Sequence, residues 1–266
     1  MFFARKSTSA LPLFLLALLS VAQAAPSLDP EPFEARFEIE VRGFAVGEAE
    51  WSVQRSADGF IYETRTKAIG VAAMLGDRRV VERSEWKRIG DDIRPAEYRY
   101  ERSDRSDKNT AVVFDWNEGI VENTRRGQTS RMSIPVDTLD KLGYMLMLIE
   151  DLRAGKRSVR YHIADGKNRM KIYQLKVVGE ERMKTALGTF EVLRIIRERK
   201  DDDRETTVWI APELGFIPVR IEHRERDDEE VTISIRSLSR RPLAEGHAGD
   251  NLEARERDEA LPDARQ

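Results

Sequence analysis

Cysteine is missing from all 266 residues of the chain. Without it we expect neither a disulfide framework nor a lipid attached to a cysteine side chain. Histidine occurs three times, as His162, His223 and His247, and no two of these have the spacing of a metal-binding pair. A glycine-rich phosphate loop and a Gly-x-Ser-x-Gly nucleophile elbow are also absent. We therefore predict no metal, no cofactor and no catalytic residue.

The chain also lacks an excess of positive charge. It carries 45 lysines and arginines against 48 aspartates and glutamates, and the two signs alternate along nearly every segment. A nucleic-acid-binding domain normally concentrates positive charge on one face or helix. We therefore exclude nucleic acid as a partner and interpret the charges as solvated strand faces.

Long hydrophobic runs are almost absent too. The run near the start, Leu11–Leu19, follows Arg5 and Lys6 and precedes Ala22-Gln23-Ala24, which together form the pattern of a cleaved export signal. No later segment approaches the roughly 18 apolar residues that a membrane-spanning helix needs. The sequence predicts a signal peptide over residues 1–24. After cleavage we expect a soluble periplasmic protein with no membrane span and no lipid anchor.

The chain is rich in two-residue alternation, the pattern of half-buried strands. From Phe33 to Arg42 apolar residues alternate with mostly charged ones. Asp58-Gly59 and Asn117-Glu118-Gly119 supply hairpin turns, because glycine and asparagine tolerate the positive φ that such turns require. Further strands are predicted at Ala49–Val53, Phe60–Thr66, Val80–Lys87, Ala96–Tyr100, Thr110–Trp116, Ser158–Ala164, Arg169–Val178, Phe190–Arg197, Thr206–Ile210, Ile217–Arg224 and Val231–Leu238.

One segment has a helical period instead. Between Asp137 and Ala154, apolar residues recur at three- and four-residue intervals, which is the stripe of an amphipathic helix. Asp137 is the expected N-cap and Gly155 the expected stop. This is the only long helix that the pattern predicts after the signal peptide.

Many hairpin-linked strands and a single helix predict a mainly β fold. We expect a strongly curved antiparallel sheet, or incomplete β-barrel, with one long amphipathic helix packed on it. Within Arg169–Val178 the apolar phase slips, which predicts a β-bulge. The segment from Arg241 onward has few large apolar residues and many charges, so we expect it to be disordered. The predicted domain organisation is a linker over residues 25–32, a single β-rich domain over residues 33–240 and a charged tail over residues 241–266.

Polar residues on otherwise apolar strand faces suggest a cavity. Glu82 and Ser84 share a face with Trp86, whereas Arg83 and Glu85 lie on the solvated face. A lone carboxylate buried in a dry core costs several kcal/mol, so these strand ends face either solvent or a wet cavity. Aromatic and methionine side chains on such faces would line a cavity, although each residue taken alone is more typical of a packed core. The ligand-cavity candidates are Trp51, Tyr62, Glu82, Trp86, Tyr98, Tyr100, Phe114, Met145, Ile149 and Trp209.

An ordered set of short segments carries a family resemblance. The set is Val46–Ala49 before Trp51, Val80–Trp86 before Ile93-Arg94-Pro95, Asp165-Gly166-Lys167, Thr185–Val192, and Val208–Ala211 before Ile217–Ile221. In this order the segments resemble the exported bacterial family known as domain of unknown function 3108, over roughly Phe33–Ser239. The resemblance implies an exported protein and assigns no catalytic residue.

The closing hairpin, Trp209–Ile221, is also similar to periplasmic lipoprotein carriers. Their fold is an incomplete β-barrel in which helices form a lid over an apolar cavity, whereas this sequence predicts one long helix. We therefore expect binding of a lipid-like or other amphipathic envelope molecule in a barrel cavity. The alternative is a non-catalytic scaffold or accessory protein of an envelope assembly, with a protein partner. A hydrolase is the third functional class, but the sequence shows no nucleophile–base pair that would support it.

Overall fold

The computed structural model describes Leu28, residues 30–74, Gly76, and residues 78–198, 205–224 and 230–240. The predicted signal peptide, part of the predicted linker and the predicted tail lie outside these residues.

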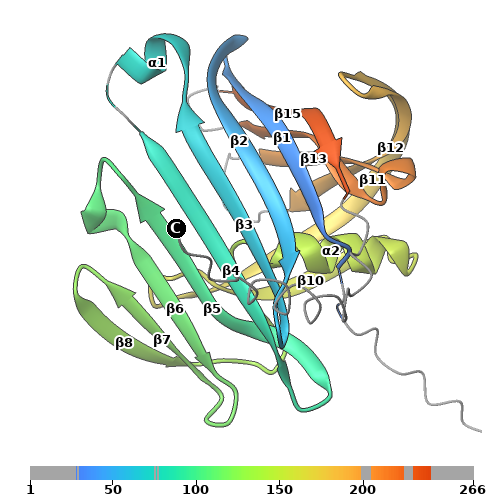
Figure 1. Ribbon diagram of the computed structural model, residues 1–266. Coiled ribbons are helices and arrows are strands. Elements are labelled where there is room, and N and C mark those ends of the chain that lie inside the picture. The colour runs from blue at the N-terminus through green and yellow to red at the C-terminus, as the bar shows by residue number, and fades with distance from the viewer. Residues whose placement is uncertain are drawn as a thin grey trace, which may run out of the picture.

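The N-terminal half of the chain is a series of antiparallel hairpins, in which each strand pairs with the one before it (Figure 1). Its alternating side chains place apolar groups on one face of the sheet and charged groups on the other. The elements are β1 (Phe33–Val41), β2 (Phe44–Arg55), β3 (Gly59–Ala68), α1 (Gly70–Met74), β4 (Arg79–Ile89), β5 (Asp92–Arg102), the 3-10 helix η1 (Ser106–Lys108), β6 (Thr110–Asp115), β7 (Ile120–Arg125) and β8 (Gln128–Ser133).

The C-terminal half begins with a short strand and the helix α2, and then returns to hairpins. Its first strand, β9, is parallel to β10, and the other pairs are antiparallel. The elements are β9 (Thr138–Asp140), α2 (Tyr144–Arg153), β10 (Ser158–Ala164), β11 (Met170–Thr185), β12 (Gly188–Glu198), β13 (Glu205–Ala211), the 3-10 helix η2 (Pro212–Leu214), β14 (Ile217–Arg224) and β15 (Glu230–Ser239).

The described strands form one 15-stranded sheet in the order β8-β7-β6-β5-β4-β3-β2-β1-β15-β14-β13-β12-β11-β10-β9. Pairing of the last strand, β15, with β1 joins the two halves of the chain. The sheet curves strongly, as the right-handed twist of its strands requires, but it does not close into a barrel (Figure 1). The predicted curved, mainly β architecture is confirmed in this form.

Two clusters of buried side chains lie on the inner face of the sheet. The larger cluster surrounds α2 and includes residues of β1–β4 and β10–β15, such as Phe37, Trp86, Leu148 and Ile195. The smaller cluster lies under β5–β7 and consists of Tyr98, Val112, Phe114, Val121 and Ala164.

The structure corrects the long helix predicted over Asp137–Ala154. Only Tyr144–Arg153 is helical, and Thr138–Asp140 pairs with β10 as a strand. The side chain of Asp140, not that of Asp137, satisfies backbone donors before the helix, because its Oδ1 accepts hydrogen bonds from the amides of the two residues that precede Tyr144, Leu142 (2.8 Å) and Gly143 (2.7 Å). The strand, the turn and the short helix all direct apolar side chains into the same core. Their combined spacing in the sequence therefore resembles the stripe of one continuous helix.

The β-bulge predicted from the change of phase between Ile172 and Tyr173 is not found there. The pairing of β10 with β11 is regular from Ser158 opposite Lys176 to Ala164 opposite Met170, so Ile172 is simply exposed. The register shifts between Val177 and Gly179, where β11 pairs with β12.

Candidate functional site

An apolar cleft of about 560 Å³ opens between the start of β5 and the strand β10; we call it the β5–β10 cleft. It lies where the cover provided by α2 ends and the smaller cluster begins. Its apolar and aromatic lining consists of Leu28, Trp86, Ile93, Pro95, Trp116, Val136, Leu139, Met147, Val159 and Tyr161.

A bulge in β5, at Ala96, places the tryptophan that lines the cleft. The register between β4 and β5 shifts between Glu85 and Trp86, so that Trp86 lies opposite Pro95. Proline lacks an N–H and fits at such an irregularity, and its carbonyl accepts a hydrogen bond from Trp116 Nε1 at 2.8 Å. The Trp86 ring stacks on Phe60 with ring centroids 5.3 Å apart. Both tryptophans are thereby held in fixed orientations.

A buried polar network lies behind Trp86. Its Nε1 donates to Ser84 Oγ at 2.7 Å, and Ser84 donates to Asp140 Oδ2 at 2.5 Å. Burial raises the pKa of the Asp140 carboxyl, although hydrogen bonds from Gly143 and Ser84 oppose the shift. Position 143 must be glycine, because an added Cβ would lie 2.5 Å from Trp86 Cζ2. The network therefore locks the Trp86 wall to the start of α2.

A second polar contact lies on the same inner face, at Glu82, two residues before Ser84 on β4. Tyr98 donates a hydrogen bond to Glu82, and burial together with the Glu82 charge raises the pKa of the Tyr98 hydroxyl. The ammonium group of Lys141 lies over the rings of Tyr98 and Tyr100, 5.9 and 5.5 Å from their centroids. Glu82 is thus half-buried with a partner rather than alone in a dry core.

Charged side chains border the β5–β10 cleft, and most of them are paired. Arg94 lies 5.1 Å from the centroid of the Trp116 ring and 2.8 Å from Asp92 Oδ2. The other charged side chains at the cleft are Asp137, Asp151, Lys156 and Arg160.

The buried carboxylate of Asp151 on α2 is satisfied from two sides. It accepts hydrogen bonds from Lys156 Nζ at 2.7 Å and from the Tyr161 hydroxyl at 2.6 Å. Burial and the Asp151 contact raise the pKa of Tyr161. Asp137 pairs with His162 at 2.9 Å. Arg160 has no ion-pair or hydrogen-bond partner among the described residues, so the mouth retains one uncompensated cation.

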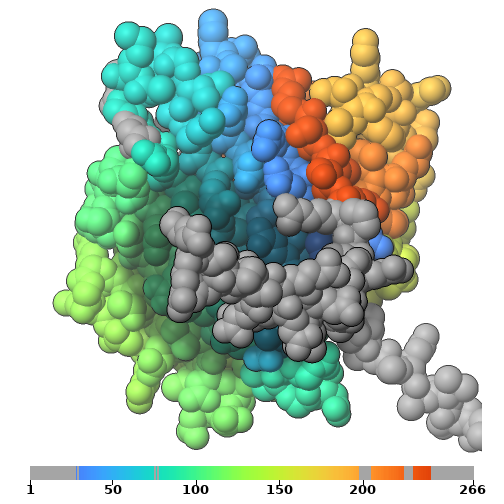
Figure 2. Space-filling view, viewed as in Figure 1, coloured from blue at the N-terminus to red at the C-terminus, as the bar shows by residue number. Residues whose placement is uncertain are grey.

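A larger groove, of about 740 Å³, lies over β15, β1, β2, β3 and β4. The space-filling view shows the surface hollowed over β2–β4 (Figure 2). Charged side chains border it, and many are paired with each other, as Lys67 is with Glu48 at 2.9 Å and Arg36 with Glu50 at 3.4 Å. Four of its 14 lining residues are apolar, Phe37, Ala49, Val80 and Val81, and only Phe37 is aromatic, whereas ten of the 18 residues of the β5–β10 cleft are apolar or aromatic.

The structure brings most of the sequence-predicted cavity residues into the interior. Tyr62, Trp86, Met145, Ile149 and Trp209 belong to the larger cluster, and Trp51 packs against it. Tyr98 and Phe114 belong to the smaller cluster, against which Tyr100 packs, and Glu82 binds Tyr98. Of the ten candidates, Trp86 alone lines the β5–β10 cleft.

Beside α2 the interior is filled by side chains of the larger cluster. The opening between α2, Phe33 and Ile217 measures only about 10 Å³, room for at most one water molecule. The assignment of the other nine candidates to a ligand remains a prediction.

Sequence reasoning missed several residues of the cleft. Trp116 was predicted at a strand end, without any signal that it faces the same space as the helix. Asp151 gave a usable signal, because it interrupts the apolar stripe of α2 between Leu148 and Leu152 and is buried there. Arg160 lies on the polar side of its strand, and only the neighbouring elements make its position informative.

Within the part of the chain that the structure describes, no three His, Asp or Glu side chains gather in a way that could hold a metal ion. None of the helices described is long and apolar enough to cross a membrane.

The chain belongs to the family described as protein of unknown function DUF3108, whose model matches residues 36–235. The resemblance read from the sequence is thereby confirmed. No curated protein matches the chain.

Among solved structures, the chain is similar to a β-barrel-like protein of the domain of unknown function DUF1849 from Brucella abortus. The TM-score is 0.54 and the identity 12%, with 80% of this chain and 99% of that chain covered. A protein of Bacteroides fragilis with a YmcC-like fold matches with a TM-score of 0.33 and 9% identity, over 80% of this chain and 97% of that chain. At these identities the first match shows a shared barrel-like fold and nothing about activity.

Proposed function

We propose that this member of the DUF3108 family binds a lipid-like, anionic amphipathic molecule of the bacterial envelope in the β5–β10 cleft. The observation that supports the proposal is the combination of apolar walls with an unpaired arginine at the mouth. The cleft volume of about 560 Å³ lies within the range of roughly 300–1,000 Å³ typical of small-molecule sites.

The walls suit a flexible hydrocarbon chain. The rings of Trp86 and Trp116 offer rigid apolar faces, and the thioether of Met147 adapts to irregular shapes. Each methylene group that leaves water for such a site contributes about 0.8 kcal/mol. An acyl chain therefore supplies affinity without any specific polar contact.

The mouth suits a negatively charged headgroup. Arg94 and Lys156 are neutralised by Asp92 and Asp151, whereas Arg160 has no such partner within the described residues. A guanidinium group binds carboxylate or phosphate oxygens in a two-pronged geometry. Arg160 is thus the residue that we expect to select the headgroup.

A direct test measures displacement of a fluorescent anionic fatty-acid analogue from the purified protein. We expect Met147→Trp to weaken binding at least about tenfold, because the larger ring fills the space of an acyl chain. Arg160→Ala should weaken binding of the anionic probe about tenfold and leave binding of an uncharged analogue unchanged.

Matched controls separate these effects from misfolding. Arg88→Ala removes an exposed arginine at the β4–β5 turn, outside the cleft, and should bind the probe as wild type does. Native mass spectrometry and lipid extraction of protein purified from the envelope should reveal a bound amphiphile. Protein that is empty, and that takes up no offered lipid, would show the proposal to be wrong.

A second candidate function, an accessory role in an envelope assembly, is supported by the open edge of the sheet. The outer edge of β8 pairs with no other described strand, and such an edge can accept a strand from a partner. A photo-crosslinking residue at Arg131, whose side chain is exposed on β8, should then recover one envelope protein reproducibly. The same residue at Arg88 should not.

A further inference from the structure

One end of the sheet carries exposed apolar side chains, which we call the apolar tip. It consists of Phe44, Val71 and Met74, with exposed fractions of 75%, 76% and 84%. Val71 and Met74 are three residues apart on α1 and so lie on one side of that helix. The amide of Ile69 donates to the carbonyl of Val46 at 3.0 Å, which holds α1 beside the start of β2. The tip thus projects from the sheet as a unit.

Positive charge gathers beside the apolar tip, at the adjoining ends of β4–β7; we call this surface the basic rim. Its six cations face only three acids on the same described segments, Glu101, Asp104 and Asp107. The whole chain has a formal net charge of -3, so the excess is local. The cations are Arg78, Arg102, Arg105, Lys108, Arg125 and Arg126.

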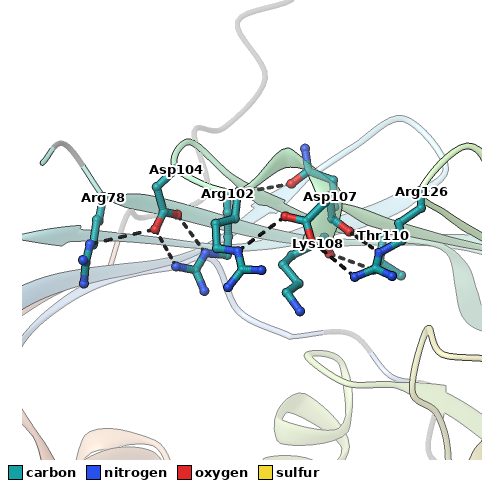
Figure 3. Close-up of polar contacts among 9 residues, drawn as sticks. Arg78, Arg102, Asp104, Asp107, Lys108, Thr110 and Arg126 are labelled. Atoms are coloured by element: carbon teal, nitrogen blue, oxygen red, sulfur yellow. Dashed lines mark hydrogen bonds and ion pairs between the residues drawn. The ribbon is translucent and has the colours of Figure 1, made fainter.

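The rim keeps its excess charge because its acids are shared. Asp104 lies between Arg78 and Arg102, at 3.9 and 2.7 Å, as Figure 3 shows. Asp107 lies between Arg105 and Arg126, at 3.4 Å from each. Each carboxylate thus holds two guanidinium groups in place and neutralises only one of their charges.

We propose that the apolar tip and the basic rim together dock the protein on the surface of an anionic lipid bilayer. Phosphate headgroups complement the guanidinium groups in charge and geometry. Separate, protruding apolar side chains enter a deformable headgroup layer without needing a matching pocket. The inference does not depend on the ligand proposed for the β5–β10 cleft.

Docking of this kind fixes an orientation. The tip and the rim lie at the end of the sheet marked by α1, and the β4–β5 turn beside the cleft lies at the opposite end (Figure 1). The 11 residues of β4 span about 35 Å in an extended strand. A docked molecule would therefore hold its cleft about 35 Å from the bilayer, so that membrane and cleft serve different partners.

Vesicle co-sedimentation of the exported protein tests the proposal. Wild type should bind vesicles of phosphatidylglycerol at low salt, bind pure phosphatidylcholine weakly, and lose affinity as salt screens the rim. Combining Phe44→Ser, Val71→Ser and Met74→Ser should lower partitioning at least about tenfold. Reversing Arg78 and Arg126 to glutamate should lower it by about fivefold or more for each residue.

Two control variants carry the same chemical changes at the other end of the sheet. Ile89→Ser alters a side chain that is 36% exposed and lies outside the cleft, and Arg88→Glu reverses a charge at the β4–β5 turn; both should sediment as wild type does. Wild type that fails to bind the anionic vesicles overturns the proposal. Equal loss of binding in the control variants, or unchanged binding in either test variant, overturns it as well.

Discussion

The two parts of the inner sheet face are buried in different ways. Around α2, side chains from both halves of the sheet meet the helix in one large apolar cluster. Under β5–β7 the cluster is small, and its cover from the C-terminal half comes from residues such as Ala164 and Leu142 near the ends of β9 and β10. Polar groups occupy the same inner face there, including Glu82, Ser84 and Asn123. The β5–β10 cleft lies at the boundary between the two parts.

The difference shows what a single short helix can cover. Ten residues of α2 extend about 15 Å, which is less than the width of a 15-stranded sheet. Where the helix ends, side chains must either find polar partners or leave a cleft. The structure does both, because Trp86 donates a hydrogen bond to the Asp140 network and also lines the cleft.

Removing equivalent apolar groups should distinguish the two clusters. Val192→Ala in the larger cluster should lower the free energy of unfolding by about 2–3 kcal/mol, because the packed surroundings cannot collapse into the cavity. Val121→Ala in the smaller cluster should cost only about 1–2 kcal/mol. Urea unfolding monitored by tryptophan fluorescence measures both. Equal losses would contradict the picture of one tightly packed and one thinly covered region.

The buried Asp140 carboxyl should make the boundary region sensitive to pH. Its folded pKa is raised by burial, so the folded state takes up the proton more readily than the unfolded state. Stability attributable to this group therefore increases as pH falls through its folded pKa toward the unfolded value of about 4, by about 1.4 kcal/mol for each unit between the two values. Above the folded pKa the cost of burying the charge is fully present.

The measurement compares wild type with Asp140→Asn between pH 7 and pH 4. Other carboxyl groups contribute equally to both proteins and cancel in the difference. The free energy of unfolding of wild type, relative to the variant, should rise as pH falls. A difference that stays flat, or that falls, would contradict the assignment.

A substitution at Asn123 should have the smallest effect on stability, and it tests how the polar groups beside the smaller cluster are satisfied. The Asn123 side chain is buried, and neither atom of its side-chain amide has a hydrogen-bond partner among the described residues. Asn123→Leu should therefore stabilise the protein by about 1 kcal/mol, since it removes an unsatisfied polar group at similar volume. Asn109→Leu is the matched control, because it removes an acceptor that lies 2.9 Å from the Arg102 amide and should destabilise. Destabilisation by both variants would mean that Asn123 has a polar partner after all.

Most of the strands could be predicted from the sequence, and the reason is local. The two-residue alternation of Phe33–Arg42 sets which side chains face inward wherever the strand lies in the sheet. The prediction for Ile217–Arg224 coincides with β14 residue for residue. The helix failed because the apolar spacing around Leu139 arises from a strand that happens to share the core of α2.

The candidate site could be predicted only in part. Trp86 was correctly placed on a face with polar neighbours, but its position at the cleft depends on Pro95 across the strand pair and on the start of α2. Arg160 and Trp116 carry no local sign that they face one space. A sequence pattern with a period of two or 3.6 residues shows which face of one element a residue occupies. It does not show that residues of three or more elements line the same cleft.

By itself the sequence determined the family, the mainly β architecture and the two faces of most strands, because these follow from residue type and short-range spacing. Tertiary structure alone decided that β15 pairs with β1, that α2 stops at ten residues, and that the sheet stays open. It also decided that Ser84 meets Asp140, which is 56 residues further along the chain. Such contacts depend on how a twisted sheet brings distant strands together, and no local pattern encodes that distance.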